Sequence, residues 1–148
     1  MGSMKLDDIT VSPLQRIKVI GGDVLHIVKN TDPGFQTFGE AYFSEVKFGA
    51  VKAWKLHKQM QMNLIVPIGT VKFVFSINLK NDYRIEVIGE DNYNRITVPP
   101  GIWFGFKGLV EPSSLVLNVS NVLYSKDEID QIPADSISYN WATENTSS

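Results

Sequence analysis

The feature of this sequence that most restricts its fold is a series of short alternating runs, separated by turn residues roughly every 8 to 12 positions. In Thr70–Phe75, for example, Val71, Phe73 and Phe75 occupy every second position. Successive side chains of a strand point to opposite faces, so this pattern is typical of a strand with one buried face. About nine such runs predict an all-β sandwich or barrel of antiparallel strands.

Two of the longer stretches share one order of features. Val51–Phe75 joins two strand-like runs through a polar segment that holds lysines and a histidine, and it turns at Val66–Gly69. Ile96–Phe106 (ITVPPGIWFGF) has a β-branched run, a Pro-Pro-Gly turn at 99–101 and then aromatic residues. Because each stretch reads as strand, tight turn and strand, the two together outline a small antiparallel barrel.

The remaining chain adds further strands and one helix. Ile17–Ile20 and Val24–Lys29 flank a Gly-Gly-Asp turn and predict a hairpin. Strands are also predicted within Glu40–Phe48, within Tyr83–Ile88 and over Ser114–Ser120. One short C-terminal helix is predicted over Ser125–Ile132, because a serine precedes two acidic residues, as in a capped first turn.

Size and composition limit the classes of protein. The 148 residues suffice for one domain, which we expect over residues 4–142, with 1–3 added during cloning and 143–148 forming a frayed tail. The absence of cysteine excludes disulfides and thiolate chemistry. A net charge of −2 argues against a nucleic-acid partner. No apolar run approaches the ~20 residues that a membrane helix needs, so we expect a soluble, cytoplasmic protein with no membrane partner.

Few side chains in the sequence suit catalysis. Lys52, Lys55 and Lys58 lie at intervals of three, and they could be solvated lysines or could face a ligand. His57 shares a strand face with Lys55 under simple alternation, whereas His26 is interpreted as a half-buried strand histidine. Two histidines and no cysteine are too few for a histidine-rich metal site, so we expect neither metal nor cofactor.

Four blocks of the chain resemble the RmlC-like cupins, the family of dTDP-4-dehydrorhamnose 3,5-epimerase and related nucleotide-sugar epimerases and ketoisomerases. They lie at Gly39–Trp54, Leu56–Phe75, Val98–Leu109 and Asp127–Trp141, in the order of the family. The block VPPGIWFGFKGL is the most specific of the four. The resemblance implies a cupin-type jelly-roll barrel, usually a homodimer, that binds a nucleotide sugar inside the barrel and holds its diphosphate with basic residues near the mouth.

The resemblance also implies roles for individual residues. Lys52 matches the basic residue that binds phosphate, and Lys55 stands where the family has the histidine that removes the sugar C–H proton. His57 lies two positions later, and a register slip would bring it to the position of the base. Phe104 replaces a second family histidine, and Asn118 is the nearest match to the family tyrosine that protonates the opposite face.

We therefore predict Lys55 and His57 as catalytic residues, with the acid left open among Tyr42, Tyr83, Tyr93 and Tyr124. The predicted substrate-binding residues are Lys52, Trp54, Lys58, Asn63, Trp103, Phe104 and Asn118. The predicted function is epimerisation of a 4-keto-6-deoxy sugar nucleotide for surface-polysaccharide synthesis. The alternative is a cupin that binds the sugar nucleotide without turnover and acts as a partner or regulator.

Overall fold

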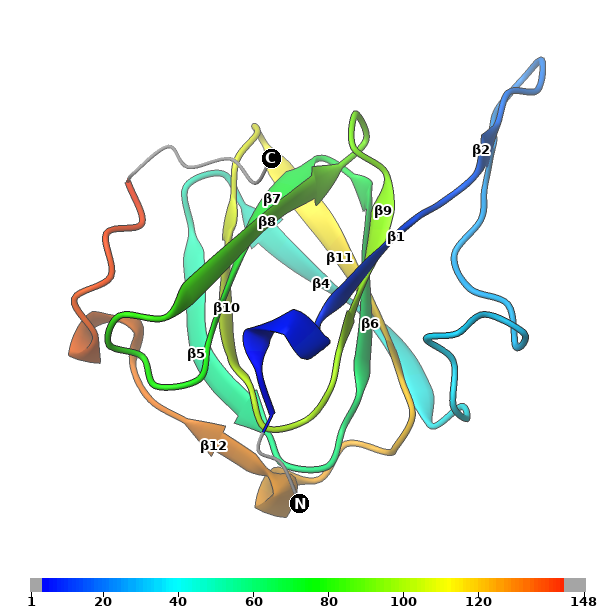
Figure 1. The fold of residues 1–148 in the computed structure, drawn as a ribbon. Coiled ribbons are helices and arrows are strands. Elements are labelled where there is room, and N and C mark those ends of the chain that lie inside the picture. Colours follow the sequence, from blue (N-terminus) through cyan, green and yellow to red (C-terminus); the bar gives the residue numbers. More distant parts are fainter. Residues whose placement is uncertain (1–3, 143–148) are drawn as a thin grey trace.

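The fold is a barrel of two five-stranded sheets that face each other (Figure 1). The computed structural model describes residues 4–142, so the expectations for 1–3 and 143–148 lie outside the described residues. Sheet I runs in the order β1 (Thr10–Pro13), β9 (Asn94–Val98), β6 (Met62–Ile68), β11 (Ser113–Ser120) and β4 (Glu40–Lys47). Sheet II runs in the order β12 (Ile129–Gln131), β5 (Val51–His57), β10 (Trp103–Gly108), β7 (Thr70–Ser76) and β8 (Tyr83–Gly89). Pairing within both sheets is antiparallel, which confirms the predicted jelly-roll barrel.

The two predicted tight turns carry the chain from one sheet to the other. The turn at Gly69 joins β6 of sheet I to β7 of sheet II, and the Pro-Pro-Gly turn joins β9 to β10 in the same way. Gly69 has φ +89°, and a Cβ there would lie 2.1 Å from the Ser114 hydroxyl oxygen. Glycine is therefore required at this crossing for both conformation and space.

The space between the sheets holds the main hydrophobic core. As the alternation predicts, Val71, Phe73 and Phe75 of β7 are fully buried there, together with inward residues of sheet I such as Val46 and Leu64. Burial of each large apolar side chain stabilises the fold by about 1.5–3 kcal/mol. One end of the space between the sheets is left unfilled.

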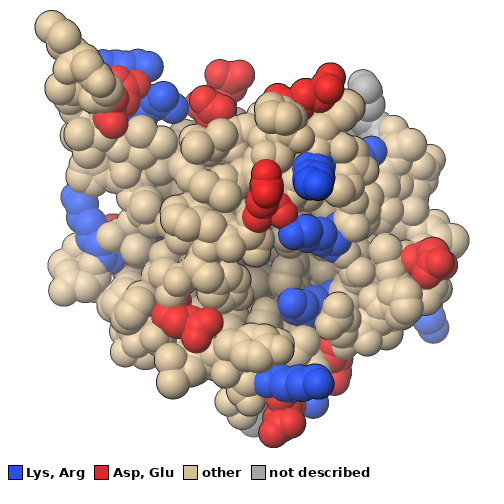
Figure 2. Space-filling view, turned by 180° about the vertical axis from the view of Figure 1, so that it is seen from behind, with Lys and Arg blue, Asp and Glu red and all other residues tan. Residues whose placement is uncertain are grey.

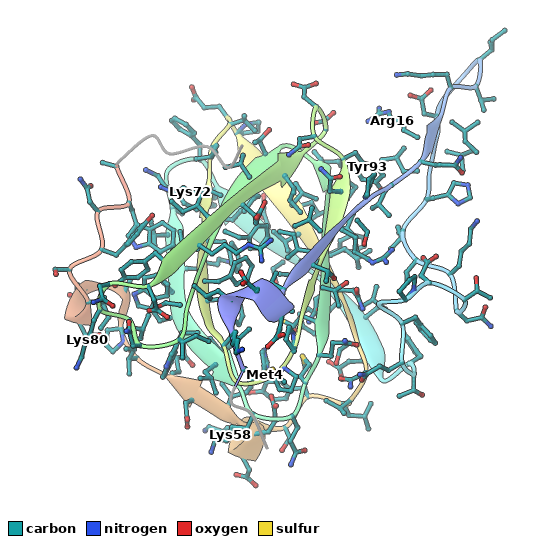
Figure 3. The ribbon with its side chains drawn as sticks, viewed as in Figure 1. Met4, Arg16, Lys58, Lys72, Lys80 and Tyr93 are labelled. Carbon is teal, nitrogen blue, oxygen red and sulfur yellow. The ribbon has the colours of Figure 1, made fainter. Side chains whose placement is uncertain are left out.

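A second apolar layer covers the outer face of sheet II. Residues 133–142 fold back along this face, at the left of Figure 1, and place Tyr139 and Trp141 against Trp54 of β5. Lys72, labelled in Figure 3, lies under the same segment with its ammonium 5.4 Å from the centre of the Tyr139 ring. The C-terminal segment therefore fixes the outside of the strands whose inner faces form the cavity described below.

The predicted helix over Ser125–Ile132 is wrong. A three-residue 3₁₀ turn occupies Lys126–Glu128, and the chain continues as strand β12, which pairs with β5 in the register Ile129 to His57. The sequence signals a helical first turn, but pairing with the edge of β5 satisfies the following backbone groups and outweighs that local preference. The other 3₁₀ turns are Leu6–Asp8 and Ala134–Ser136, and no helix within residues 4–142 has the length and apolarity to cross a membrane.

The predicted N-terminal hairpin is confirmed in a shorter form. β2 (Arg16–Ile17) pairs with β3 (Val24–Leu25), and the hairpin extends away from the barrel (Figure 1). Asp23 closes its turn through bonds to the Arg16 guanidinium and the Val19 backbone. Hydrogen bonds from Arg16 and Lys18 lower the pKa of Asp23 to about 2.

Candidate active site

A cavity of about 400 Å³ lies between the two sheets. Its walls come from β4, β6 and β11 on one side and from β5, β10 and β12 on the other. The polar residues that line it are Tyr42, Ser44, Lys52, Lys55, His57, Asn118 and Gln131. Figure 2 shows Lys and Arg side chains gathered beside a hollow on this side of the molecule. The cavity thus combines a basic rim with an apolar lining that holds a few polar groups, and this combination is typical of small-molecule sites.

His57 forms a buried pair with Glu128 at one end of the cavity. Its Nδ1 lies 2.5 Å from Glu128 Oε2, and the two side chains are 4% and 5% exposed. The imidazole ring stacks on Phe104 at 5.8 Å, and the His57 carbonyl accepts a 2.7 Å hydrogen bond from the Gly101 N–H. The Pro-Pro-Gly turn and its downstream strand therefore hold His57 from two sides.

The Glu128 carboxylate is held by more than the imidazole. Its Oε1 accepts hydrogen bonds from the backbone N–H groups of Gln59 at 2.9 Å and Met60 at 3.0 Å. Burial alone would raise the pKa of Glu128, but the bonds from His57, Gln59 and Met60 favour the anion and leave this pKa lowered. An ionised Glu128 accepts a hydrogen bond from the Nδ1–H of His57. The other ring nitrogen, Nε2, is then the one available to the cavity.

An irregularity in β5 explains how two lysines three positions apart share one strand face. Lys55 lies opposite Phe104 and Lys52 lies opposite Phe106, and both phenylalanines pack in the inner core. The register shifts between these pairs, so Trp54 has no partner on β10. Trp54 instead packs on the outside of sheet II, fully buried. This bulge brings the Lys52 and Lys55 side chains to the same cavity.

The opposite wall presents a tyrosine and an amide. Tyr42 of β4 and Asn118 of β11 are register partners, and Asn118 also pairs with the inward-facing Leu64. The Tyr42 hydroxyl lies 3.0 Å from Asn118 Nδ2. Burial raises the pKa of Tyr42, although the hydrogen bond from Asn118 acts in the opposite direction.

Of the four tyrosines proposed as acids, Tyr42 is the one that lines this cavity. Tyr83 packs in the outer aromatic layer, and the Tyr93 hydroxyl donates to the His26 carbonyl near the N-terminal arm (Figure 3). Tyr124 is 59% exposed in the loop after β11. Only Tyr42 among them is therefore placed to meet a molecule bound in the cavity.

The structure gathers most, but not all, of the predicted site residues. Lys52, Trp54, Lys55, His57, Phe104 and Asn118 line the cavity, although the fully buried Trp54 ring packs in the outer layer. Three others lie elsewhere. Lys58, labelled in Figure 3, is exposed, and its ammonium is 3.5 Å from an Asp130 carboxylate oxygen. Asn63 forms hydrogen bonds with Arg95 and Thr97 on the outer face of sheet I. Trp103 packs on the outer face of sheet II.

Sequence reasoning missed Glu128 and Gln131. Glu128 was assigned to the first turn of a helix, where an acidic residue has an ordinary explanation in the helix dipole. Its one available signal was its position in the resembling block Asp127–Trp141. Within residues 4–142 no group of three or more His, Asp or Glu side chains is arranged to hold a metal ion.

Known proteins similar to this chain share its length. A dTDP sugar isomerase from Desulfovibrio desulfuricans G20 is 32% identical, with coverage of 93% of this chain and 92% of that one and a TM-score of 0.85. The spore coat polysaccharide biosynthesis protein SpsL of Bacillus subtilis is 25% identical over 148 residues, 94% of this chain and 98% of that one. The probable low-salt glycan biosynthesis epimerase Agl13 of Haloferax volcanii is 27% identical over 143 residues, covering 88% and 89%.

More distant structures agree on the fold. A dTDP-4-dehydrorhamnose 3,5-epimerase from Bacillus anthracis has a TM-score of 0.78 at 17% identity, over 97% of this chain and 90% of that one. No protein-family model matches the sequence. The 32% identity over almost the whole of both chains, together with the jelly-roll and its cavity, shows that the chain belongs to the RmlC-like cupin family of nucleotide-sugar epimerases and isomerases.

Proposed function

We propose that this protein is an isomerase of the dTDP-4-dehydrorhamnose 3,5-epimerase type that acts on a 4-keto-6-deoxy sugar nucleotide. The observation that carries the proposal is the buried His57–Glu128 pair inside a basic-rimmed cavity. Epimerisation beside a ketone requires a base that removes a C–H proton and groups that stabilise the resulting enolate. The cavity offers one candidate for each of these tasks.

His57 is the better candidate for the base. Glu128 fixes the imidazole in the tautomer with the Nδ1 proton, so Nε2 carries the lone pair that accepts the substrate proton. Phe104 and the Gly101 N–H restrict the position of the ring. Lys55 is less buried than His57, and within residues 4–142 no carboxylate pairs with its ammonium as Glu128 pairs with the imidazole. We therefore assign proton removal to His57 and stabilisation of the enolate oxygen to the Lys55 ammonium.

Lys52 suits the diphosphate. Its side chain is exposed at the cavity, and its Nζ donates to the Glu45 carbonyl at 2.6 Å, which holds the ammonium at the β4–β5 end of the site. A lysine acts on phosphate as a point charge and needs no fixed geometry. The similarity to a dTDP sugar isomerase supports dTDP as the nucleotide, and the similarity to SpsL supports a place in polysaccharide synthesis.

The test is exchange of solvent deuterium into the sugar. With dTDP-4-keto-6-deoxyglucose in D₂O, NMR should show loss of a proton signal on a carbon adjacent to the ketone. His57→Asn should lower this exchange by about 100- to 10,000-fold, because a general base contributes that much. His26→Asn is the matched control, since His26 is the other histidine of the chain and lies outside the cavity.

The outcomes separate the two functions that the sequence left open. Exchange that depends on His57 supports the isomerase. If dTDP raises the melting temperature while no 4-keto sugar nucleotide exchanges, the protein binds without turnover and the isomerase proposal is wrong. Equal loss in the His57 and His26 variants would contradict the choice of base.

We also propose that the protein is a homodimer, as the family resemblance implies. Ile17, Val19, Ile20 and Val24 on or beside the projecting hairpin are all more than 40% exposed, and Ile20 is fully exposed. Exposed apolar side chains gathered on one projecting element favour a protein partner. A second copy is the partner that the proposal names.

A further inference from the structure

The bulge in β5 has one extra residue, Trp54. Two consecutive residues of β10 pair with Lys55 and Ala53, so Trp54 falls between the pairs. Side chains of a regular strand alternate between the two faces, and residues three positions apart would point to opposite sides. The bulge is therefore the reason that Lys52 and Lys55 both line the cavity.

The backbone of Trp54 is bonded on the side away from β10. Its N–H donates to the Ile132 carbonyl at 3.0 Å, and its carbonyl accepts from the Ile132 N–H at 3.1 Å. This reciprocal pair continues the β12–β5 ladder, in which Gln131 lies opposite Lys55. The residue that leads into the C-terminal segment 133–142 therefore holds the extra residue of the bulge in place.

The C-terminal segment also encloses the Trp54 side chain. The indole is fully buried, with the centre of the Trp141 ring at 5.3 Å and that of the Tyr139 ring, set edge-on, at 6.0 Å. Aromatic pairs at such distances attract each other beyond simple burial. Lys107 Nζ donates to the Trp141 carbonyl at 3.3 Å and so anchors the end of this packing to β10.

Gly105 of β10 gives the Trp141 ring room to reach the sheet. A Cβ at Gly105 would lie 2.5 Å from the Ala53 Cβ and 3.1 Å from a ring carbon of Trp141. A glycine inside a strand often marks a point of close approach. Here it accommodates both the crowded chain at the bulge and the ring that covers it.

From these contacts we infer that Trp54 and Trp141 are positioning residues, which fix the bulge from outside and so keep Lys52 turned to the diphosphate. The inference rests on the proposed function, in which Lys52 binds that group. Without the outer packing β5 can straighten, and a slip of one residue turns a side chain to the other face. His57 is held separately, by Glu128 and the Pro-Pro-Gly turn, so the site should keep its base and lose its phosphate contact.

A double-mutant cycle on dTDP binding tests this coupling. Isothermal titration calorimetry gives the Kd of dTDP for the wild type, Lys52→Gln, Trp141→Ala and the double variant. Each single change should weaken binding by about 10-fold or more, because each removes the Lys52 ammonium from the diphosphate. The double variant should bind about as weakly as the weaker single variant, since Trp141→Ala has already displaced the lysine.

Two controls separate positioning from a general loss of stability. Ile85→Ala removes an apolar side chain from the same outer layer, but on β8, so Lys52→Gln should keep its full effect in that background. Trp141→Phe keeps an aromatic ring against Trp54, and within residues 4–142 the indole N–H of Trp141 has no hydrogen-bond partner to lose. This variant should therefore bind dTDP within about threefold of the wild type.

Amide hydrogen exchange provides a readout that needs no ligand. In Trp141→Ala, protection of the Trp54 amide, which donates to Ile132, should fall by about 10-fold or more. The Lys58 amide donates to the Glu128 carbonyl at 2.8 Å at the other end of the same β5–β12 edge. Its protection should stay at the wild-type value.

Each outcome bears on one claim. An equal effect of Lys52→Gln in the wild-type and Trp141→Ala backgrounds would overturn the inference, and so would unchanged protection of the Trp54 amide. Failure of the wild type to bind dTDP would defeat the proposed nucleotide site instead, while the amide exchange still decides whether the C-terminal segment holds the bulge.

Discussion

Replacement of Glu128 by glutamine tests how the carboxylate acts on His57. Oε1 of Glu128 accepts from two backbone N–H groups, so the amide oxygen of Glu128→Gln must take that position, since an amide nitrogen there would face two donors. The amide nitrogen then replaces Oε2 and donates to His57 Nδ1. A neutral imidazole that accepts at Nδ1 carries its proton on Nε2. The variant keeps the shape of the site but presents the wrong tautomer to the substrate.

The size of the effect follows from these contacts. In serine proteases, where an aspartate holds the histidine in the same way, the change to asparagine lowers kcat by about 10⁴. We expect exchange in Glu128→Gln to fall by about 10²- to 10⁴-fold. The free energy of unfolding should fall by only about 1–3 kcal/mol, because the hydrogen bonds remain but lose their charged acceptor. Glu128→Ala leaves the buried donors of His57 and Met60 and the partly buried Gln59 N–H without an acceptor, and it should cost about 3–5 kcal/mol.

Two measurements on the same variants check this reasoning. Deuterium exchange gives the catalytic loss, and urea unfolding gives the free energies. The loss of exchange and the loss of stability should not go together: Glu128→Gln should be severely impaired in exchange yet clearly more stable than Glu128→Ala. If Glu128→Gln exchanges at nearly the wild-type rate, Glu128 does not select the tautomer and the assignment of Nε2 as base loses its support.

Three further outcomes are expected. Folding lowers the pKa of Glu128, so the stabilisation by its carboxylate is present above the unfolded pKa of about 4.3 and is lost as pH falls through the folded pKa. Urea unfolding between pH 6 and 3 should therefore show that the difference in free energy of unfolding between wild type and Glu128→Gln decreases. A constant difference would contradict the lowered pKa. Gly69→Ala meets both a positive φ and the Ser114 side chain, so its melting temperature should fall by several degrees, corresponding to about 2–4 kcal/mol, and an unchanged value would refute the strained turn. Sedimentation equilibrium should give about twice the chain mass of 16.6 kDa. A hairpin variant with Ile17 and Ile20 changed to serine should sediment as a monomer, and a variant that remains a dimer would contradict an interface at the hairpin.

Alternation in the sequence was sufficient to predict most of the barrel. β7 is an example, because the alternation of its inward residues Val71, Phe73 and Phe75 is a local pattern that can be read without knowing which strands pair with it. The predicted helix over Ser125–Ile132 is wrong because Ile129–Gln131 pair with the edge of β5 instead. This pairing depends on the folded position of β5, and no local sequence pattern indicates it.

The site was harder to predict because wall assignments depend on strand pairing. Asn63 and Trp103 look suitable for a ligand, but the register of β6 and β10 puts them on the outer faces. Trp54 breaks the alternation of β5, so simple counting could not show that Lys52 and Lys55 share a face. Glu128 reaches His57 across 71 positions of sequence, a contact that only the folded chain defines.

The most direct test of the central claim is a crystal structure of the protein with a 4-keto-6-deoxy sugar nucleotide. The account predicts the sugar inside the barrel, with His57 Nε2 about 3–3.5 Å from a carbon adjacent to the ketone and the diphosphate beside Lys52. A sugar bound outside the cavity, or one whose ketone-adjacent carbons lie beyond the reach of His57, would contradict it.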